Sequence, residues 1–470
     1  MKKHNLLKVT LLTLLLVIIG SWFLPVTSIV DGKFSTVEST KIGLFTLTSY
    51  IEIIFRIFLP IIIYVLAVGG LYGVLFRIPQ YRVLLDKIVN GFKGKEWLFM
   101  SIVGIVFACL SSMAEFSVPL ILLFPFVISV ILLMGYDKIT AAMLTVGSTI
   151  AGLIGTVFSL NQNYGIEQVL GLAANTNVAW KIGLLVVSLA LVLVNTITYG
   201  RKHRTYENYE KEHLVPKKVN TKNNKVYPLV IVLDLLLVVL VLAYISWSLL
   251  DVKLFTDITN AFIKPTGEFA KGLYGGLNTV LGITEEHVFG TWTLLHASLT
   301  VFLASGLIAF LYRKSFNTFV SATENGAKKA MRPALLVVLA YLIVVAIVTV
   351  PFEMTILKPI LSADSGFQII PMIIVAIFYS LLTVESYYGI TSAATYVLAV
   401  TSTSASKVGI ISLIWQSMYG LTMLIAPTSV ILLVTLSYLD ISYGKWLKAI
   451  WKLLLELFVA ILVILLIFNI

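Results

Sequence analysis

The sequence predicts an all-α polytopic membrane protein with about 11–13 transmembrane helices in two inverted repeats, each containing a re-entrant hairpin. Three observations predict this class. The chain is 59% hydrophobic and only 12% charged, whereas soluble domains carry about 25% charged residues. Many apolar runs reach the roughly 18 residues that a membrane-spanning helix needs. Finally, the two halves of the chain resemble each other.

The apolar runs define the expected spans. The first run follows Lys2 and Lys3 and could be a secretory signal peptide, but no small-residue cleavage site follows it. We therefore interpret it as an uncleaved first helix. The expected spans are 6–25, 50–76, 96–112, 117–135, 138–159, 178–198, 227–249, 291–312, 333–351, 368–384, 407–424, 426–440 and 447–469.

The net charge of +11 is spread over the segments between these spans. This distribution is typical of cytoplasmic loops that follow the positive-inside rule, and it argues against nucleic acid as a partner. We expect a bacterial cytoplasmic membrane protein with a cytoplasmic N-terminus, in which Asn220 is not labelled from outside. The segments expected inside are 77–95, 201–226, 313–332 and 443–448, and those expected outside are 26–44 and 250–288.

The repeat divides the chain into a first transmembrane half at 1–200, a basic linker at 201–226 and a second half at 227–470. The stretch GLYGVLFR, from Gly70, is similar to GLIAFLYR, from Gly306. Each is followed by a polar stretch with an Asn-Gly pair and lysines, NGFKGK and NGAKKA, and then by an apolar span. Two such halves fit a duplicated transporter. The alternative is chance similarity between apolar segments of simple composition.

Two places within the apolar region are too polar for plain spanning helices, near 111–119 and near 383–406. Irregular backbone is tolerated at membrane depth only where it lines protein or a cavity. We therefore expect a re-entrant hairpin at each place, with the two hairpins approaching each other at the midplane. Glu115 and Glu385 are the carboxylates of these hairpins, and an ionisable residue inside a membrane is a candidate for binding substrate, ion or proton. The alternative for both is a structural hydrogen bond.

Other ionisable residues have structural explanations. Glu52 and Arg56 are four residues apart and can pair on one helix face, Glu353 follows a proline and fits a loop, and Asp137 fits a helix N-terminus. His296 fits either a hydrogen-bonded packing role or a proton relay.

Small residues and missing motifs narrow the function further. The stretch from Gly147 to Thr156 is rich in Gly, Ser and Thr, which let helices approach closely. The chain has no GxxxxGK[ST] motif for nucleotides. It also has no HExxH or GxSxG motif and no Cys/His cluster, so we expect neither a metal site nor an enzyme.

Several of these motifs resemble the YfcC-like, or C4-dicarboxylate anaerobic carrier, family of the ion transporter superfamily, which includes arginine/ornithine antiporter-like carriers. The similar stretches are SMAEFSVP from Ser112, GYDKITAAMLTVGSTIAGLIGT from Gly135, Ser386–Thr395, PTS from Pro427 and YGKWL from Tyr443. The sequence departs from the family pattern where Phe116 replaces a second Glu, where Met418-Tyr419-Gly420 replaces Gly-Asp-Gly, where Met423 replaces an Asn, and at VFSLNQNYG.

The resemblance implies a secondary active transporter that moves a small organic solute, an amino acid, carboxylate or short peptide, by alternating access. It would be ion-coupled or work by exchange, with Na⁺ or H⁺ as coupling ion and no other cofactor. Its partners would be the solute and the lipid bilayer, with a homodimer as one option. The alternatives are a non-transporting scaffold or partner subunit, and then an intramembrane enzyme. The expected substrate- or ion-binding residues are Ser111, Ser112, Glu115, Ser117, Gly147, Ser148, Glu385, Ser386, Gly389, Thr391, Ser392, Gln416, Thr428 and Ser429.

Overall fold

The computed structural model shows a largely helical protein. Glu115 and Asn220, which carry two of the sequence predictions, lie outside the described residues. The structure describes residues 5–30, 33–38, 40–113, 117–158, 160–173, 176–218, 225–245, 247, 252–263, 282, 288–361 and 366–469.

The expected all-α membrane architecture is confirmed. Among the described residues, seven helices are long and apolar enough to cross a membrane, or up to eight if the α2–α3 pair, bent by 63°, forms one span. These helices are α1 (Asn5–Phe23), α2 (Leu44–Ile57), α3 (Leu59–Leu75), α5 (Glu96–Met113), α10 (Val178–Lys202), α11 (Tyr227–Tyr244), α14 (Leu294–Leu311), α15 (Phe316–Thr349) and α22 (Tyr443–Asn469).

The remaining expected spans are shorter helices interrupted by breaks. They include η1 (Pro119–Leu122), α6 (Phe124–Leu133), α7 (Lys138–Ala142), η2 (Met143–Gly147), α8 (Ser148–Ile154), α17 (Ile369–Leu382), α20 (Val408–Thr422) and α21 (Val430–Leu439). Other short elements are α4 (Pro79–Gly91), α9 (Leu160–Leu170), α12 (Leu254–Ile263), α16 (Glu353–Leu357), α18 (Ser386–Ser392), α19 (Ala394–Thr403) and η4 (Ala405–Lys407).

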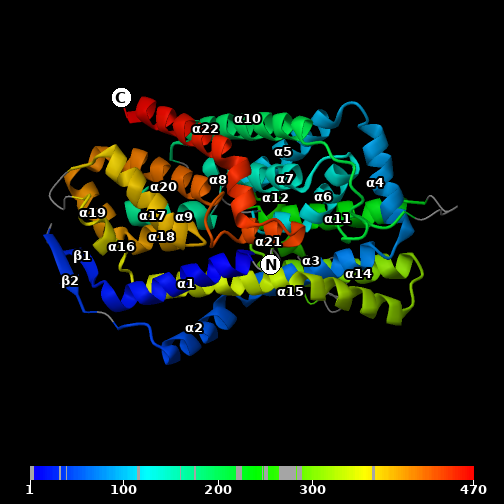
Figure 1. Ribbon diagram of the computed structural model, residues 1–470, viewed down its shortest axis with the longest axis horizontal. Coiled ribbons are helices and arrows are strands. Elements are labelled where there is room, and N and C mark those ends of the chain that lie inside the picture. The colour runs from blue at the N-terminus through cyan, green and yellow to red at the C-terminus, as the bar shows by residue number, and fades with distance from the viewer. Residues whose placement is uncertain are drawn as a thin grey trace.

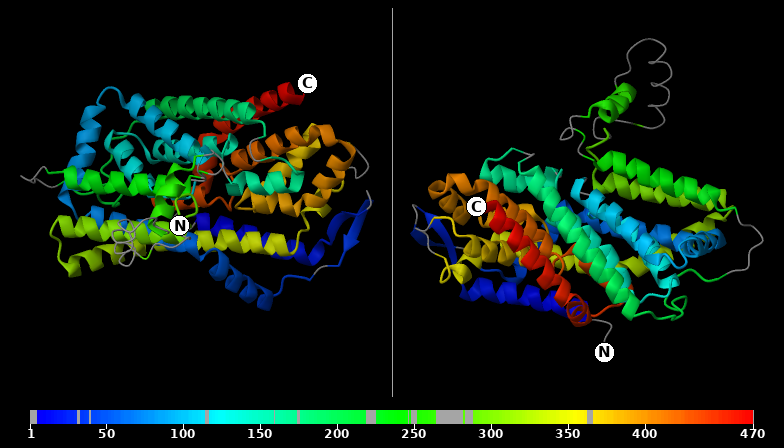
Figure 2. Two further views of the ribbon diagram at one scale, coloured as in Figure 1. Left: turned by 180° about the vertical axis from the view of Figure 1, so that it is seen from behind. Right: turned by 90° about the horizontal axis from the view of Figure 1, so that it is seen from above.

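The helices form layers. Helices α10 and α22 cover one side of the molecule, α1, α3, α14 and α15 form the opposite side, and the broken helices lie between them (Figure 1). Helix α12 stands apart from this body (Figure 2). The broken helices are therefore enclosed by continuous ones, which is where irregular backbone is tolerated in a membrane protein.

Two features differ from the expectation. A hairpin of β1 (Val26–Val30) and β2 (Lys33–Val37) occupies the expected external loop, with Val26 paired to Val37. Its β-branched residues favour strands. Most of the segment 313–332, expected as a loop, is instead the first part of α15, which begins at Phe316 and continues through Pro333 without ending.

The repeat itself explains the long α15. In the first half α4 ends before Gly94, which has φ +79°, a left-handed conformation that glycine adopts without steric cost. Alignment of NGFKGK with NGAKKA places Lys329 at the position of Gly94. Lysine favours the helix, so the second half continues as one helix where the first half breaks into α4 and α5.

A tight contact between α3 and α15 forms the scaffold. A Cβ added to Gly73 would lie 2.1 Å from the carbonyl oxygen of Ala322, and one added to Gly326 would lie 2.1 Å from that of Gly69. Only glycine allows backbones to approach this closely.

The repeat also relates the helices on either side of the break between α4 and α5 to helices of the second half. Gly70–Arg77, at the end of α3, aligns with Gly306–Arg313, at the end of α14, so α14 and α15 correspond to α3, α4 and α5. The inverted orientation of the two halves stays a prediction.

Candidate functional site

In the first half, the two helix breaks are bonded to each other. The Ser112 hydroxyl at the end of α5 donates to the carbonyl of Gly155 (2.7 Å), and the amides of Val157 and Phe158 donate to the Ser112 carbonyl (3.0 and 3.2 Å). These bonds satisfy backbone groups that the breaks release from their helices. Ser112 therefore holds the end of α8 against the tip of the first hairpin.

The second half uses side-chain hydroxyls for the same purpose. Tyr419 of α20 donates to the carbonyl of Val384 (2.7 Å), and Thr428 donates to that of Leu381 (3.2 Å). The end of α17 and the break that follows it are thereby joined to α20 and to the break at 423–429 between α20 and α21.

The two pairs of breaks also contact each other. The side-chain Nε2 of Gln416, which is buried in α20, donates to the carbonyl of Ile154 at the end of α8 (3.2 Å). A Cβ added to Gly420 would lie 2.5 Å from the Ile154 amide nitrogen and 2.7 Å from its Cα. Helix breaks from both halves thus converge.

A cavity of about 720 Å³ lies at this convergence, and we call it the break cavity. Its walls include Ser117 and Pro119 from the first hairpin and Glu385 and Ser386 from the second. Ser429, which precedes α21, also lines it. The size is typical of sites for small molecules.

Glu385 is oriented by a tyrosine. The Tyr341 hydroxyl donates to its Oε1 (3.1 Å), and the Tyr341 ring stacks on Phe58 with centroids 3.9 Å apart. Among the described residues that line the break cavity, Glu385 carries the only formal charge, and the other polar groups are mainly hydroxyls. Such a site can bind an amino group, a cation or a proton.

The expected site residues that the structure describes divide into three groups. The break cavity collects Ser117, Glu385, Ser386 and Ser429, so residues near both expected hairpins line one cavity, while the re-entrant course of each hairpin stays a prediction. Ser112, Gln416 and Thr428 bond breaks together, as described above. The others are not among the lining residues and lie in helix contacts or local bonds: Ser111 beside Gly152, Gly147 beside Val192, Ser148 beside Gly104, Gly389 beside Thr383, Thr391 bonded to the Tyr387 carbonyl, and Ser392 half-buried at the end of α18.

The structure places two other ionisable residues in local hydrogen bonds at helix starts. Asp137 caps α7 by accepting from the Thr140 amide (2.8 Å), as predicted. His296 accepts from the Thr293 amide (3.1 Å) at the start of α14, in agreement with the structural alternative.

Two structural expectations for carboxylates were wrong. Glu52 and Arg56 are exposed on α2 and form no ion pair with each other. Glu353 does not lie in a loop but begins α16, where it is fully buried and neither carboxylate oxygen has a hydrogen-bond partner among the described residues.

Sequence reasoning missed the tyrosines. Tyr244, Tyr341, Tyr387 and Tyr419 all line the break cavity. The sequence feature that could have identified them is tyrosine within apolar runs, since a buried tyrosine needs a partner for its hydroxyl.

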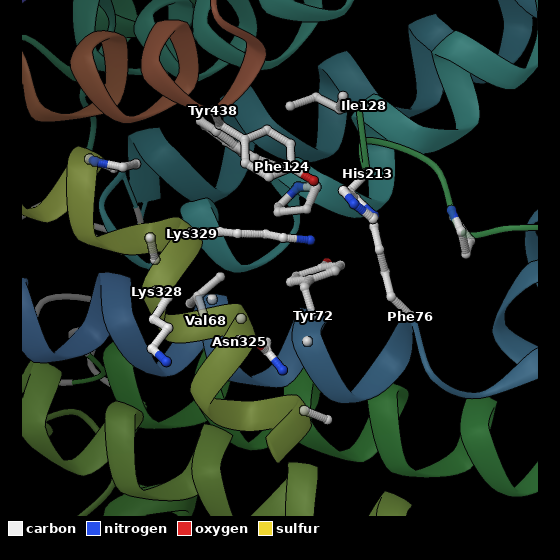
Figure 3. Close-up of a pocket in the computed structure, with 18 of the residues that line it drawn as sticks. Val68, Tyr72, Phe76, Phe124, Ile128, His213, Asn325, Lys328, Lys329 and Tyr438 are labelled. Atoms are coloured by element: carbon white, nitrogen blue, oxygen red, sulfur yellow. The ribbon is translucent and has the colours of Figure 1, made fainter. Parts of the chain in front are cut away.

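A second cavity of about 780 Å³ lies along the same elements. Ile61 of α3 and Val430 of α21 line the break cavity, whereas Val65 and Val434, one turn further along, line this second one. Cationic residues contribute to its wall, and we call it the basic cavity (Figure 3).

Comparison with known proteins agrees with a carrier. The C4-dicarboxylate anaerobic carrier (DcuC) family matches residues 10–469. A solved structure, the YdaH transporter of Alcanivorax borkumensis, is similar over 99% of this chain and 98% of its own, with 13% sequence identity and a TM-score of 0.46. No curated protein sequence matches. Because the family covers nearly the whole sequence, the chain belongs to the C4-dicarboxylate anaerobic carrier family.

Proposed function

We propose that this carrier is a secondary active transporter that binds a small amino-group-bearing organic solute, such as an amino acid, in the break cavity. The observation that supports this most is Glu385, held by Tyr341 in a cavity between helix breaks of both halves. The carboxylate would bind the amino group. The hydroxyls of Ser117, Ser386 and Ser429 would bind the solute's polar groups.

The charge of the cavity favours an amino acid over a dicarboxylate. A dicarboxylate would bring two negative charges next to Glu385, and like charges at short range in a poorly solvated site repel strongly. Among the described lining residues no Lys, Arg or His offsets this repulsion. The family name therefore does not by itself define the solute of this chain.

The tandem cavities support alternating access. Both are lined by α3, the 117–125 segment, α15 and α21, so a small movement of the hairpins against α3 and α15 would join the break cavity to one side or the other. In this proposal H⁺ or Na⁺ is the coupling ion, the membrane is the bacterial cytoplasmic membrane, and the basic linker and N-terminus face the cytoplasm. A homodimer is the proposed assembly.

A thermal-shift screen of the purified protein against amino acids and organic acids tests the solute class. We expect amino acids to raise the unfolding temperature of the wild-type protein and to lose this effect in Glu385→Gln. Glu52→Gln is the matched control, because Glu52 is exposed on α2 and outside the break cavity. Stabilisation by dicarboxylates alone would contradict the proposed solute, and no stabilisation by any compound would favour a scaffold.

A further inference from the structure

The basic cavity collects cationic side chains from three separate segments. Arg77 follows α3, His213 and Lys217 belong to the linker, and Lys328 and Lys329 belong to α15. In Figure 3, Lys329 extends into the cavity toward His213, with Tyr72 and Tyr438 on the adjacent walls. Charges that are far apart in the sequence therefore face one space.

Most of this positive charge has no acidic partner among the described residues. No Asp or Glu is among the described residues that line the basic cavity. Lys328, which also lines the cavity, pairs with Glu324, whereas the other nearby acids pair with residues outside the lining: Glu210 with Arg82, Glu212 with Lys138 and Asp440 with Arg332. Arg77, His213, Lys217 and Lys329 have no such ion pair among the described residues.

The linker segment at this cavity is fixed in place. The Ser129 hydroxyl donates to the carbonyl of Leu214 (2.7 Å), and Arg82 donates to that of Pro216 (2.7 Å). Leu214 is adjacent to His213, and Pro216 is adjacent to Lys217. These two hydrogen bonds therefore fix the backbone that carries the His213 and Lys217 side chains. The pKa of the His213 side chain is lowered from its ordinary value. The positive charge of Lys329 is the largest cause, followed by burial and the positive charge of Lys217.

We propose that the basic cavity is a binding site for a small anionic group, a phosphate or carboxylate, held by Lys329, Arg77, His213 and Lys217. The volume of about 780 Å³ accommodates such a group together with an organic body, and the aromatic walls formed by Tyr72, Phe76 and Phe124 suit an apolar portion of it. The site is separate from the break cavity and does not depend on which solute is transported.

Calorimetric titration of the purified protein with inorganic phosphate and with succinate tests the site. Lys329→Gln should weaken binding at least about tenfold, as expected for loss of a charge-assisted bond. Lys448→Gln removes the same charge from α22, outside the cavity, and should change affinity less than about twofold. Arg77→Gln is the second variant if Lys329→Gln does not fold.

Two further experiments test whether the anion is a free solute or a lipid headgroup, and whether His213 contributes to binding. Binding of phosphate or succinate in phosphatidylcholine nanodiscs supports a free anion, whereas selective retention of phosphatidylglycerol, without either soluble probe, supports a lipid headgroup. Sulfate is the probe for the histidine, because it keeps its charge as the pH falls from about 7.5 to 5.5. The affinity of the protein for sulfate should rise over this range through protonation of His213, and this rise should disappear in His213→Gln.

Either ligand source supports the anion site, provided that Lys329→Gln or Arg77→Gln weakens binding and Lys448→Gln does not. The proposal is overturned if neither soluble anion nor phosphatidylglycerol binds. It is also overturned if Lys448→Gln weakens binding as much as Lys329→Gln, because the effect would then reflect net charge.

Discussion

Gly420→Ala perturbs the contact between the two halves at the breaks. The added Cβ would lie 2.5 Å from the Ile154 amide nitrogen, so α20 and α8 must separate by about 1 Å to restore normal contact. Overpacking of this kind costs about 1–3 kcal/mol. The same movement would stretch the 3.2 Å bond from Gln416 to Ile154, worth about 1 kcal/mol. Since alanine favours a helix over glycine by about 1 kcal/mol, we expect a net loss of about 1–3 kcal/mol.

The assay is denaturant unfolding in a mild detergent, with Gly183→Ala as the matched control. Gly183 lies in α10 with no atom within 4 Å of an added Cβ, so this variant should be as stable as wild type or slightly more stable. Equal unfolding free energies for Gly420→Ala and Gly183→Ala would refute the close contact between α20 and α8.

Three other predictions follow from individual residues. Tyr341→Phe removes the hydroxyl that donates to Glu385 and should raise KM for uptake severalfold at normal expression; an unchanged KM would show that Tyr341 does not orient Glu385. Burial raises the pKa of Glu353 to about 8, above its unfolded value, so this residue contributes stability below about pH 4.5 that is lost as pH rises to about 8; Glu353→Gln should flatten that dependence in unfolding curves, and an unchanged slope would count against it. Gly94→Ala forces a left-handed backbone on alanine and should cost about 1 kcal/mol of unfolding free energy, whereas a neutral result would indicate that the α4–α5 turn adapts.

The apolar pattern located the helices that are long enough to span a membrane, because hydrophobic length is a local property of the sequence, but it did not show that other expected spans are shorter, interrupted helices. It did not reveal that residues 316–332 belong to α15, since this required comparing Lys329 with Gly94 across the repeat. The β1–β2 hairpin was missed because a short strand pair between polar residues carries no membrane signal.

The site was predicted only in part for a related reason. Polarity within apolar runs identified Ser117, Glu385, Ser386 and Ser429, which line the break cavity. The same signal also selected residues that bond one break to another or pack between helices, as Ser112 and Ser148 do, because a buried hydroxyl looks the same in sequence whether its partner is a carbonyl or a solute. Only the three-dimensional arrangement separates these roles.

Counterflow in proteoliposomes tests the central claim, that the break cavity binds and carries an amino-group-bearing solute. Vesicles loaded with an unlabelled amino acid that stabilises the protein should accumulate the labelled form when they contain wild-type protein or Glu52→Gln, and should fail to do so with Glu385→Gln at matched protein levels. Equal counterflow by Glu385→Gln and wild type would contradict the assignment of the break cavity as the transport site.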